Sequence, residues 1–130
     1  YRAEDDYPNL DSLQGKTVAY AFGTNYQQVA ESIPDAQAVG IQGSPACIEE
    51  VKSKRADACI IDGAGAAEFL KNNAELKMSL LDKTDDCFAI GFPKESPYYE
   101  TFNNTLKEMM ENGELDAIIA DHLSEQFILD

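Results

Sequence analysis

A turn from an expected strand into an expected helix is the first feature of the sequence that could do chemistry. Residues 17–22 are rich in β-branched and aromatic side chains, which is typical of a strand. Gly23 breaks this pattern, and Thr24 with Gln27 three residues later has the form of a helix capping box. Backbone N–H groups at a helix start attract anions. The Gly23-Thr24-Asn25 turn is therefore a candidate carboxylate site, although an ordinary strand-to-helix turn has the same pattern.

Asp62 is the second candidate, because it ends an expected buried strand over residues 56–62. A carboxylate in this place can accept hydrogen bonds from an ammonium group. The same side chain could instead cap the helix expected after Gly63, and the sequence leaves both interpretations open. Ligands of parallel α/β sheets bind at the carboxyl ends of the strands. Together the two candidates suit a zwitterion such as a free amino acid.

Alternating strands and helices must position these residues. The expected strands cover residues 17–22, 36–42, 56–62, 76–81 and 87–92. The intervening helices follow Thr24, Ser44 and Gly63, with Ser44 as a cap and the next residue, a proline, in the first turn. Two more helices follow residue 97, and Gly113 ends the first of them. This alternation predicts an α/β fold, a largely parallel sheet flanked by helices, with two C-terminal helices.

The composition indicates one domain by length and excludes some classes of partner. The 130 residues carry 24 acidic and 10 basic side chains, a formal net charge of −14. This charge argues against nucleic acids and anionic membrane surfaces as partners. The sequence has no apolar run long enough to span a bilayer. It begins at Tyr1 rather than Met, so we expect it to come from a longer protein.

The cysteines and the single histidine do not suggest a metal or catalytic centre. Cys47, Cys59 and Cys87 lack Cys-x-x-Cys spacing, and His122 is distant in sequence. We therefore expect no metal, no cofactor and no catalytic residue. Cys59 and Cys87 lie in apolar runs typical of buried thiols. One disulfide is compatible with the three cysteines, but the sequence does not choose a pair.

Six short motifs, taken in order and spacing, resemble a known family. They are Gly15–Ala19, Gly23-Thr24, Arg55–Ala58, Asp62, Phe88–Lys94, and the segment from Asn103 and Leu106 to Asn112-Gly113. The set covers about Leu10 to the C-terminus. It is similar to the polar amino-acid-binding proteins of ABC importers, which have the periplasmic binding protein type 2 fold and are called family 3 solute-binding proteins.

The resemblance implies a protein of two lobes, joined by two crossing strands, that clamp the ligand between them. This chain resembles the second lobe. Residues 1–15 would be a residual inter-lobe segment, residues 16–92 the α/β ligand-binding lobe, and residues 93–130 a helical segment that returns to the missing first lobe. The arginine with which the family grips the ligand's α-carboxylate belongs to that first lobe. Neither Arg2 nor Arg55 matches its position.

The resemblance also implies roles for single residues. Asp62 matches the aspartate that binds the ligand's α-amino group. Thr24 and Asn25, after Gly23, match the helix start that holds the α-carboxylate. The family often has Thr, Ser or Gly at the position of Asn25, so the contact expected there is through the backbone N–H. Ala21 matches a position that shapes ligand selectivity, and the neighbouring Tyr26 is a candidate wall of the site.

The function implied is that of a periplasmic or extracytoplasmic solute-binding protein, present as a fragment, that binds a free amino acid for ABC-type import. Its partners would be the amino acid and a membrane permease. One alternative is a ligand-binding sensory domain of a receptor or sensor kinase with the same fold. A dehydratase on the same scaffold is less favoured, because the sequence has no nucleophile–base pair or acidic dyad.

The helices after residue 97 carry an apolar stripe that, in the family, would pack against the first lobe. The stripe consists of Tyr99, Phe102, Leu106, Met109 and Met110. Soluble monomers rarely expose a large apolar patch. We therefore expect these helices to fold back onto the sheet or to form a homodimer with a second copy, for example by swapping.

Overall fold

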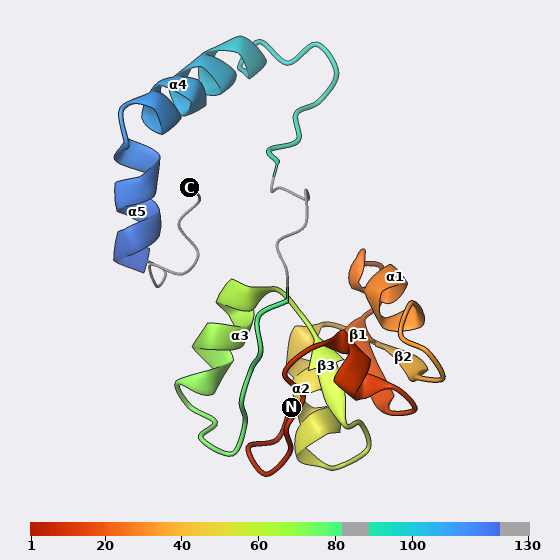
Figure 1. The fold of residues 1–130 in the computed structure, drawn as a ribbon. Helices are drawn as coiled ribbons and strands as arrows, with labels where there is room; N and C mark the ends of the chain where they lie inside the picture. Colours follow the sequence, from red (N-terminus) through yellow and green to blue (C-terminus); the bar gives the residue numbers. More distant parts are fainter. Residues whose placement is uncertain (82–88, 123–130) are drawn as a thin grey trace. The chain divides into compact units, whose positions relative to one another are not determined.

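The computed structural model describes residues 1–81 and 89–122. The chain forms two compact units, Tyr1–Asp82 and Lys83–Asp130. The first unit contains the sheet, and the second contains the C-terminal helices (Figure 1).

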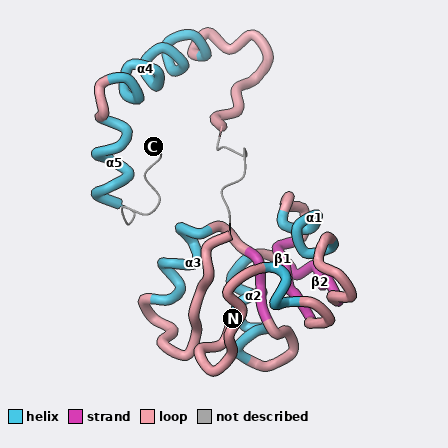
Figure 2. Tube along the Cα trace, viewed as in Figure 1, coloured by secondary structure: helices cyan, strands magenta, loops and turns pink. Residues whose placement is uncertain are grey.

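The first unit is built on a parallel sheet of three strands. They are β1 (Thr17–Ala21), β2 (Gln37–Ile41) and β3 (Ala58–Ile60), in the order β2-β1-β3. In the parallel pairing of β1 with β3, Tyr20 lies opposite Ile60. Figure 2 shows the three strands side by side, with loops and helices connecting them. The predicted α/β fold with a parallel sheet is confirmed.

Helices cover both faces of this sheet, and the side chains of β1 alternate between the two hydrophobic cores that result. Val18 and Tyr20 belong to the core that includes Ala30 of α1 (Tyr26–Glu31). The alanines at positions 19 and 21 belong to the opposite core, which includes Cys47 of α2 (Ser44–Lys52). Side chains of α3 (Gly63–Leu70) also pack against this second core. The short helix η1 (Leu10–Leu13) precedes β1.

The N-terminal segment pairs with the chain that follows α3. The backbone N–H of Ala3 donates to Glu75 O at 2.7 Å, and that of Lys77 donates to Tyr1 O at 2.8 Å. Only one antiparallel bridge, between Arg2 and Leu76, results. The strand predicted over residues 76–81 is therefore wrong, because a strand needs a paired neighbour and residues 78–81 have none among the residues that the structure describes.

The second unit consists of α4 (Tyr99–Glu111) and α5 (Glu114–His122), which meet at Gly113, whose φ is +79°. The two predicted C-terminal helices are therefore confirmed. The strand predicted over residues 87–92 is wrong where the structure can be described, because residues 89–92 form no ladder with the other described residues. Its first two residues lie outside the described part of the chain.

The two described cysteines are free thiols, Cys47 in α2 and Cys59 in β3. Burial raises the pKa of both thiols, and that of Cys59 reaches about 11. By exposure Cys47 is buried and Cys59 is half-buried, so the expected burial of Cys59 is confirmed only in part, and Cys87 lies outside the described residues. Within residues 1–81 and 89–122, no helix combines the length and apolar character needed to cross a bilayer.

Candidate ligand site at the carboxyl edge of the sheet

The strand order creates a switch point between β1 and β3. The chain leaves β1 through α1 on one face, and it reaches β3 through α2 on the other face. Open α/β sheets bind ligands outside the carboxyl ends of the two strands at such a point. Because Tyr20 lies opposite Ile60, the turn that begins at Gly23 and the carboxylate of Asp62 follow neighbouring strand ends. Both sequence candidates therefore belong to this edge.

Asp62 caps α3 with one of its two carboxylate oxygens. Its backbone is extended, with φ −62° and ψ 145°, and Oδ1 accepts a hydrogen bond from the Gly65 N–H at 2.6 Å. This is the capping role that the sequence left open. Within the part of the chain that the structure describes, Oδ2 accepts no hydrogen bond from the protein. One carboxylate oxygen of a partly buried side chain thus remains available to a donor.

The helix after β1 starts one residue later than the sequence predicts. Asn25 is the residue at the N-cap of α1, with helical φ −65° and ψ −16°, and its side chain makes no capping hydrogen bond. Thr24 is therefore not the cap, and the predicted capping box is wrong. The amide of Gln27 bonds instead to Glu31, at 2.8 Å, within the same helix. The start of α2 is displaced in the opposite direction, because its N-cap is Gly43, one residue before the predicted Ser44.

The hydroxyl of Thr24 stabilises the turn itself. Its Oγ1–H donates to Ala21 O at 2.7 Å, and its backbone N–H donates to the same oxygen at 3.3 Å. A hydroxyl has a single proton to donate, so Thr24 Oγ1 can only accept hydrogen bonds from other groups while this bond persists. Gly23 allows the turn because its φ is +82°, where a residue with a side chain is strained.

The side chains expected to line the site differ in how accessible they are. Ala21 is only 6% exposed and faces the core under α2 and α3. Tyr26 is half-buried and packs against the other core. Phe22, which the sequence interpretation did not single out, is 74% exposed immediately before Gly23. Phe22 could have been identified from its position, because it follows Tyr20 at a spacing of two residues and so continues the same face of the strand past its end.

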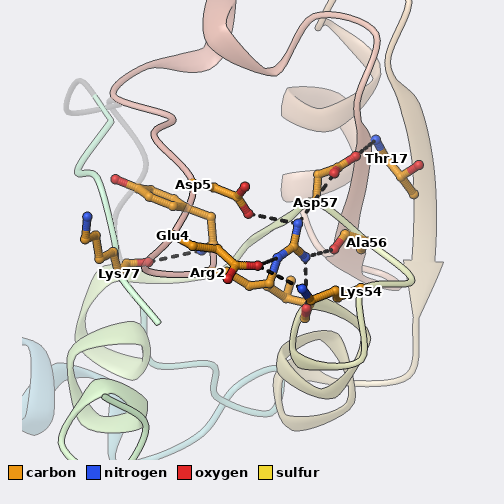
Figure 3. Close-up of polar contacts among 10 residues, drawn as sticks. Arg2, Glu4, Asp5, Thr17, Lys54, Ala56, Asp57 and Lys77 are labelled. Atoms are coloured by element: carbon orange, nitrogen blue, oxygen red, sulfur yellow. Dashed lines mark hydrogen bonds and ion pairs between the residues drawn. The ribbon is translucent and has the colours of Figure 1, made fainter. Parts of the chain in front are cut away.

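Arg2 lies at the opposite edge, where the strands begin. Figure 3 shows its guanidinium surrounded by polar groups of the N-terminal segment and of the loop before β3. Nη1 donates to Val51 O at 3.0 Å and to Ala56 O at 2.8 Å, and Nη2 pairs with Asp5 Oδ2 at 2.8 Å. The side chain is 13% exposed. This arginine is therefore engaged within the protein, in agreement with its failure to match the family's ligand-gripping arginine.

Asp57 connects the cluster of Arg2 and its polar partners to the sheet. Its Oδ2 accepts a hydrogen bond from the backbone N–H of Thr17, the first residue of β1, at 2.9 Å (Figure 3). Its Oδ1 lies 3.7 Å from Nη2 of Arg2. The cluster thus joins the N-terminal segment to the starts of β1 and β3. Among the residues described by the structure, no group of three His, Cys, Asp or Glu side chains could hold a metal ion.

Known proteins resemble the chain in both sequence and fold, although no family model matches it. It is 30% identical over 116 residues to the arginine-binding extracellular protein ArtP of Bacillus subtilis, an overlap of 85% of this chain and 46% of ArtP. The crystal structure of AbpA from Streptococcus pneumoniae, an amino-acid ABC transporter substrate-binding protein bound to L-arginine, superposes with a TM-score of 0.79 at 27% identity. That match covers 99% of this chain and 56% of AbpA.

One isolated domain also matches. Domain 2 from TmArgBP superposes with a TM-score of 0.58 at 29% identity, which covers 63% of this chain and 94% of that domain. The fold and these similarities define the class: the chain corresponds to one lobe of amino-acid ABC transporter substrate-binding proteins and spans about half their length. Within the class, the matched proteins named here include arginine-binding ones, and they are binding proteins rather than enzymes.

Proposed function

We propose that this chain is the second lobe of an extracytoplasmic substrate-binding protein that binds a free amino acid for an ABC importer. The observation that carries the proposal is the placement of Asp62 and the Gly23–Asn25 turn after neighbouring strands at the switch point of the sheet. The similarity to ArtP and to arginine-bound AbpA supports the same ligand class. Since both are binding proteins, they favour transport over sensing and over dehydratase chemistry.

In this proposal the two strand ends recognise the two charged groups of the amino acid. Asp62 accepts hydrogen bonds from the α-ammonium group through Oδ2, while Oδ1 remains on Gly65. The backbone around Gly23 and Asn25 faces the α-carboxylate. The Thr24 hydroxyl contributes by holding the turn, because its proton is committed to Ala21 O. Arginine is the first ligand to test.

The first lobe of the relatives, which this chain does not span, would supply the other half of the site. An arginine that grips a carboxylate forms a strong, bidentate ion pair. Losing one partner of a buried charge pair costs roughly 2–5 kcal/mol, or about 30-fold to several thousand-fold in affinity. The 130-residue chain by itself should therefore bind amino acids only weakly.

The proposal includes two macromolecular partners. A binding protein for import delivers its ligand to a membrane permease, which is the partner expected of the complete protein. The isolated chain should form a homodimer through α4 and α5, because Phe102, Met110 and Ile118 on these helices are 53%, 58% and 43% exposed.

Calorimetric titration of the complete protein with the twenty amino acids tests the proposal. We expect one of them, with arginine the first candidate, to bind at the micromolar level or better. The 130-residue chain should show no comparable affinity for the same amino acid. The proposal fails if the complete protein binds none of the twenty, and its two-lobe basis fails if the chain alone binds as tightly as the complete protein.

A further inference from the structure

Gly65 lies directly against the Asp62 carboxylate. It is the third residue of α3, and its N–H donates to Asp62 Oδ1 at 2.6 Å. A Cβ atom at this position would lie 2.8 Å from Oδ2, 2.9 Å from Oδ1 and 3.2 Å from Cγ. The whole carboxylate therefore occupies the space that any side chain at residue 65 would fill.

Glycine has no advantage for the helix itself at this position. A glycine inside a helix is destabilising relative to alanine, because it loses more backbone freedom on folding. Gly65 does not need a left-handed backbone either, since it is not among the positive-φ residues of the described chain. The Asp62 carboxylate is the group that a side chain at residue 65 would displace.

We propose that Gly65 is a positioning residue for ligand binding, which acts by letting the Asp62 carboxylate lie flat on the first turn of α3. In that position Oδ1 is fixed by the cap and Oδ2 is presented to the ligand's α-ammonium. An alanine at residue 65 would force the nearer oxygen to withdraw by about 0.6 Å to reach ordinary contact at 3.4 Å. Charge-assisted hydrogen bonds depend on such distances. This inference rests on the proposed amino-acid site.

The Gly65→Ala variant of the complete binding protein tests the inference, with arginine as the probe in calorimetry. We expect about a tenfold loss of affinity, which is a fraction of the loss on removing the charge partner altogether. The melting temperature should change little, because the helix preference of alanine offsets the weakened cap at Oδ1, and each effect is about 1 kcal/mol. Gly91→Ala is the matched control, since a Cβ at residue 91 would meet nothing within 4 Å. It should bind as the unaltered protein does.

A double-mutant cycle with Asp62→Ala separates positioning from a general effect on the lobe. If Gly65 acts through the carboxylate, Gly65→Ala should have no further effect on affinity once the carboxylate is gone. The inference is overturned if Gly65→Ala binds arginine as tightly as the unaltered protein. It is also overturned if the substitution weakens binding equally in the Asp62→Ala background. Absence of binding by the unaltered protein would instead show that the proposed function is wrong, and the inference would fall with it.

Discussion

Arg2 uses its charge for structure rather than for a ligand. Its guanidinium donates hydrogen bonds to the backbone carbonyls of Val51 and Ala56 and forms an ion pair with Asp5. The side chain is only 13% exposed. A buried hydrogen-bonded charge of this kind is costly to break, because its partners remain desolvated. Arg2 therefore fixes the N-terminal segment to the end of α2 and the loop before β3.

Replacing Arg2 by methionine should lower the free energy of unfolding of this chain by about 2–4 kcal/mol. The loss has its origin in the unpaired carbonyls and the unpaired Asp5 carboxylate. Urea unfolding measures it, and Arg55→Met is the matched control. Arg55 pairs with Glu50 but is 63% exposed, so its replacement should cost less than about 1 kcal/mol. Equal losses in the two variants would contradict the role given to Arg2.

Cys59 gives the unfolding free energy an alkaline pH dependence. Burial raises the pKa of its thiol from 9.0 to about 11, so the unfolded chain ionises first as the pH increases. The stabilisation from the neutral thiol is complete below pH 9 and is lost as the pH rises to about 11. Relative to Cys59→Ala, the unaltered chain should lose about 2–3 kcal/mol over this interval. Parallel profiles of the two proteins in urea unfolding at pH 8 to 11 would refute this.

At the scale of elements, substitutions at the start of α3 can separate the two roles of Asp62, which are the observed helix cap and the proposed contact with the α-ammonium group. Asparagine is about as good an N-cap as aspartate, whereas alanine costs about 1 kcal/mol. Asp62→Asn should therefore leave the free energy of unfolding within about 0.5 kcal/mol, and Asp62→Ala should lower it by about 1 kcal/mol. Urea unfolding of both variants of this chain makes the comparison. A loss in Asp62→Asn as large as that in Asp62→Ala would show that the cap depends on the charge.

The central part of the fold could be predicted from the sequence. The strands expected over 17–22, 36–42 and 56–62 form β1, β2 and β3. β1 is shorter than expected only at its end, whereas β2 and β3 are shorter at both ends. Their apolar runs are distinctive because a parallel sheet is covered on both faces. The strand expected over 76–81 was wrong although its residues are similarly apolar. Whether a strand forms depends on a neighbour, which a local pattern does not reveal.

The shared sheet edge of the candidate residues could be predicted from the sequence, but their local geometry could not. The cap at Asp62 follows from a strand end before a helix, and the structure confirms it. The capping box at Thr24 failed because the left-handed turn at Gly23 delays the helix by one residue, and the hydroxyl bonds back to Ala21. The contact between Gly65 and the carboxylate could not be predicted, since it depends on a rotamer rather than on a pattern.

At the scale of the whole molecule, the second unit exposes aromatic and apolar side chains. The ring of Phe92 makes edge-to-face contacts with Tyr99 and Phe102, with centroids 5.9 and 5.5 Å apart. Phe102 nevertheless remains 53% exposed, and Met110 is 58% exposed. Such side chains favour association with a second copy in a chain that spans only half of its relatives.

Light scattering of the 130-residue chain at high concentration should show a dimer, and Phe102→Glu should shift it at least tenfold toward monomer. Phe22→Glu is the matched control, because Phe22 is 74% exposed but belongs to the first unit. It should leave association unchanged. A strictly monomeric unaltered chain, or an equal effect of both substitutions, would contradict association through α4 and α5.

The most direct measurement is a calorimetric titration of the complete binding protein and its Asp62→Asn variant with arginine. The variant keeps the cap of α3 but removes the charge that we propose for recognition of the α-ammonium group. If the carboxyl edge between β1 and β3 binds the α-ammonium group, the unaltered protein should bind at the micromolar level or better. The variant should bind about 30-fold or more weakly, in line with the loss of a buried charge partner. Tight arginine binding by both proteins with equal affinity would contradict the site assigned to this edge of the sheet.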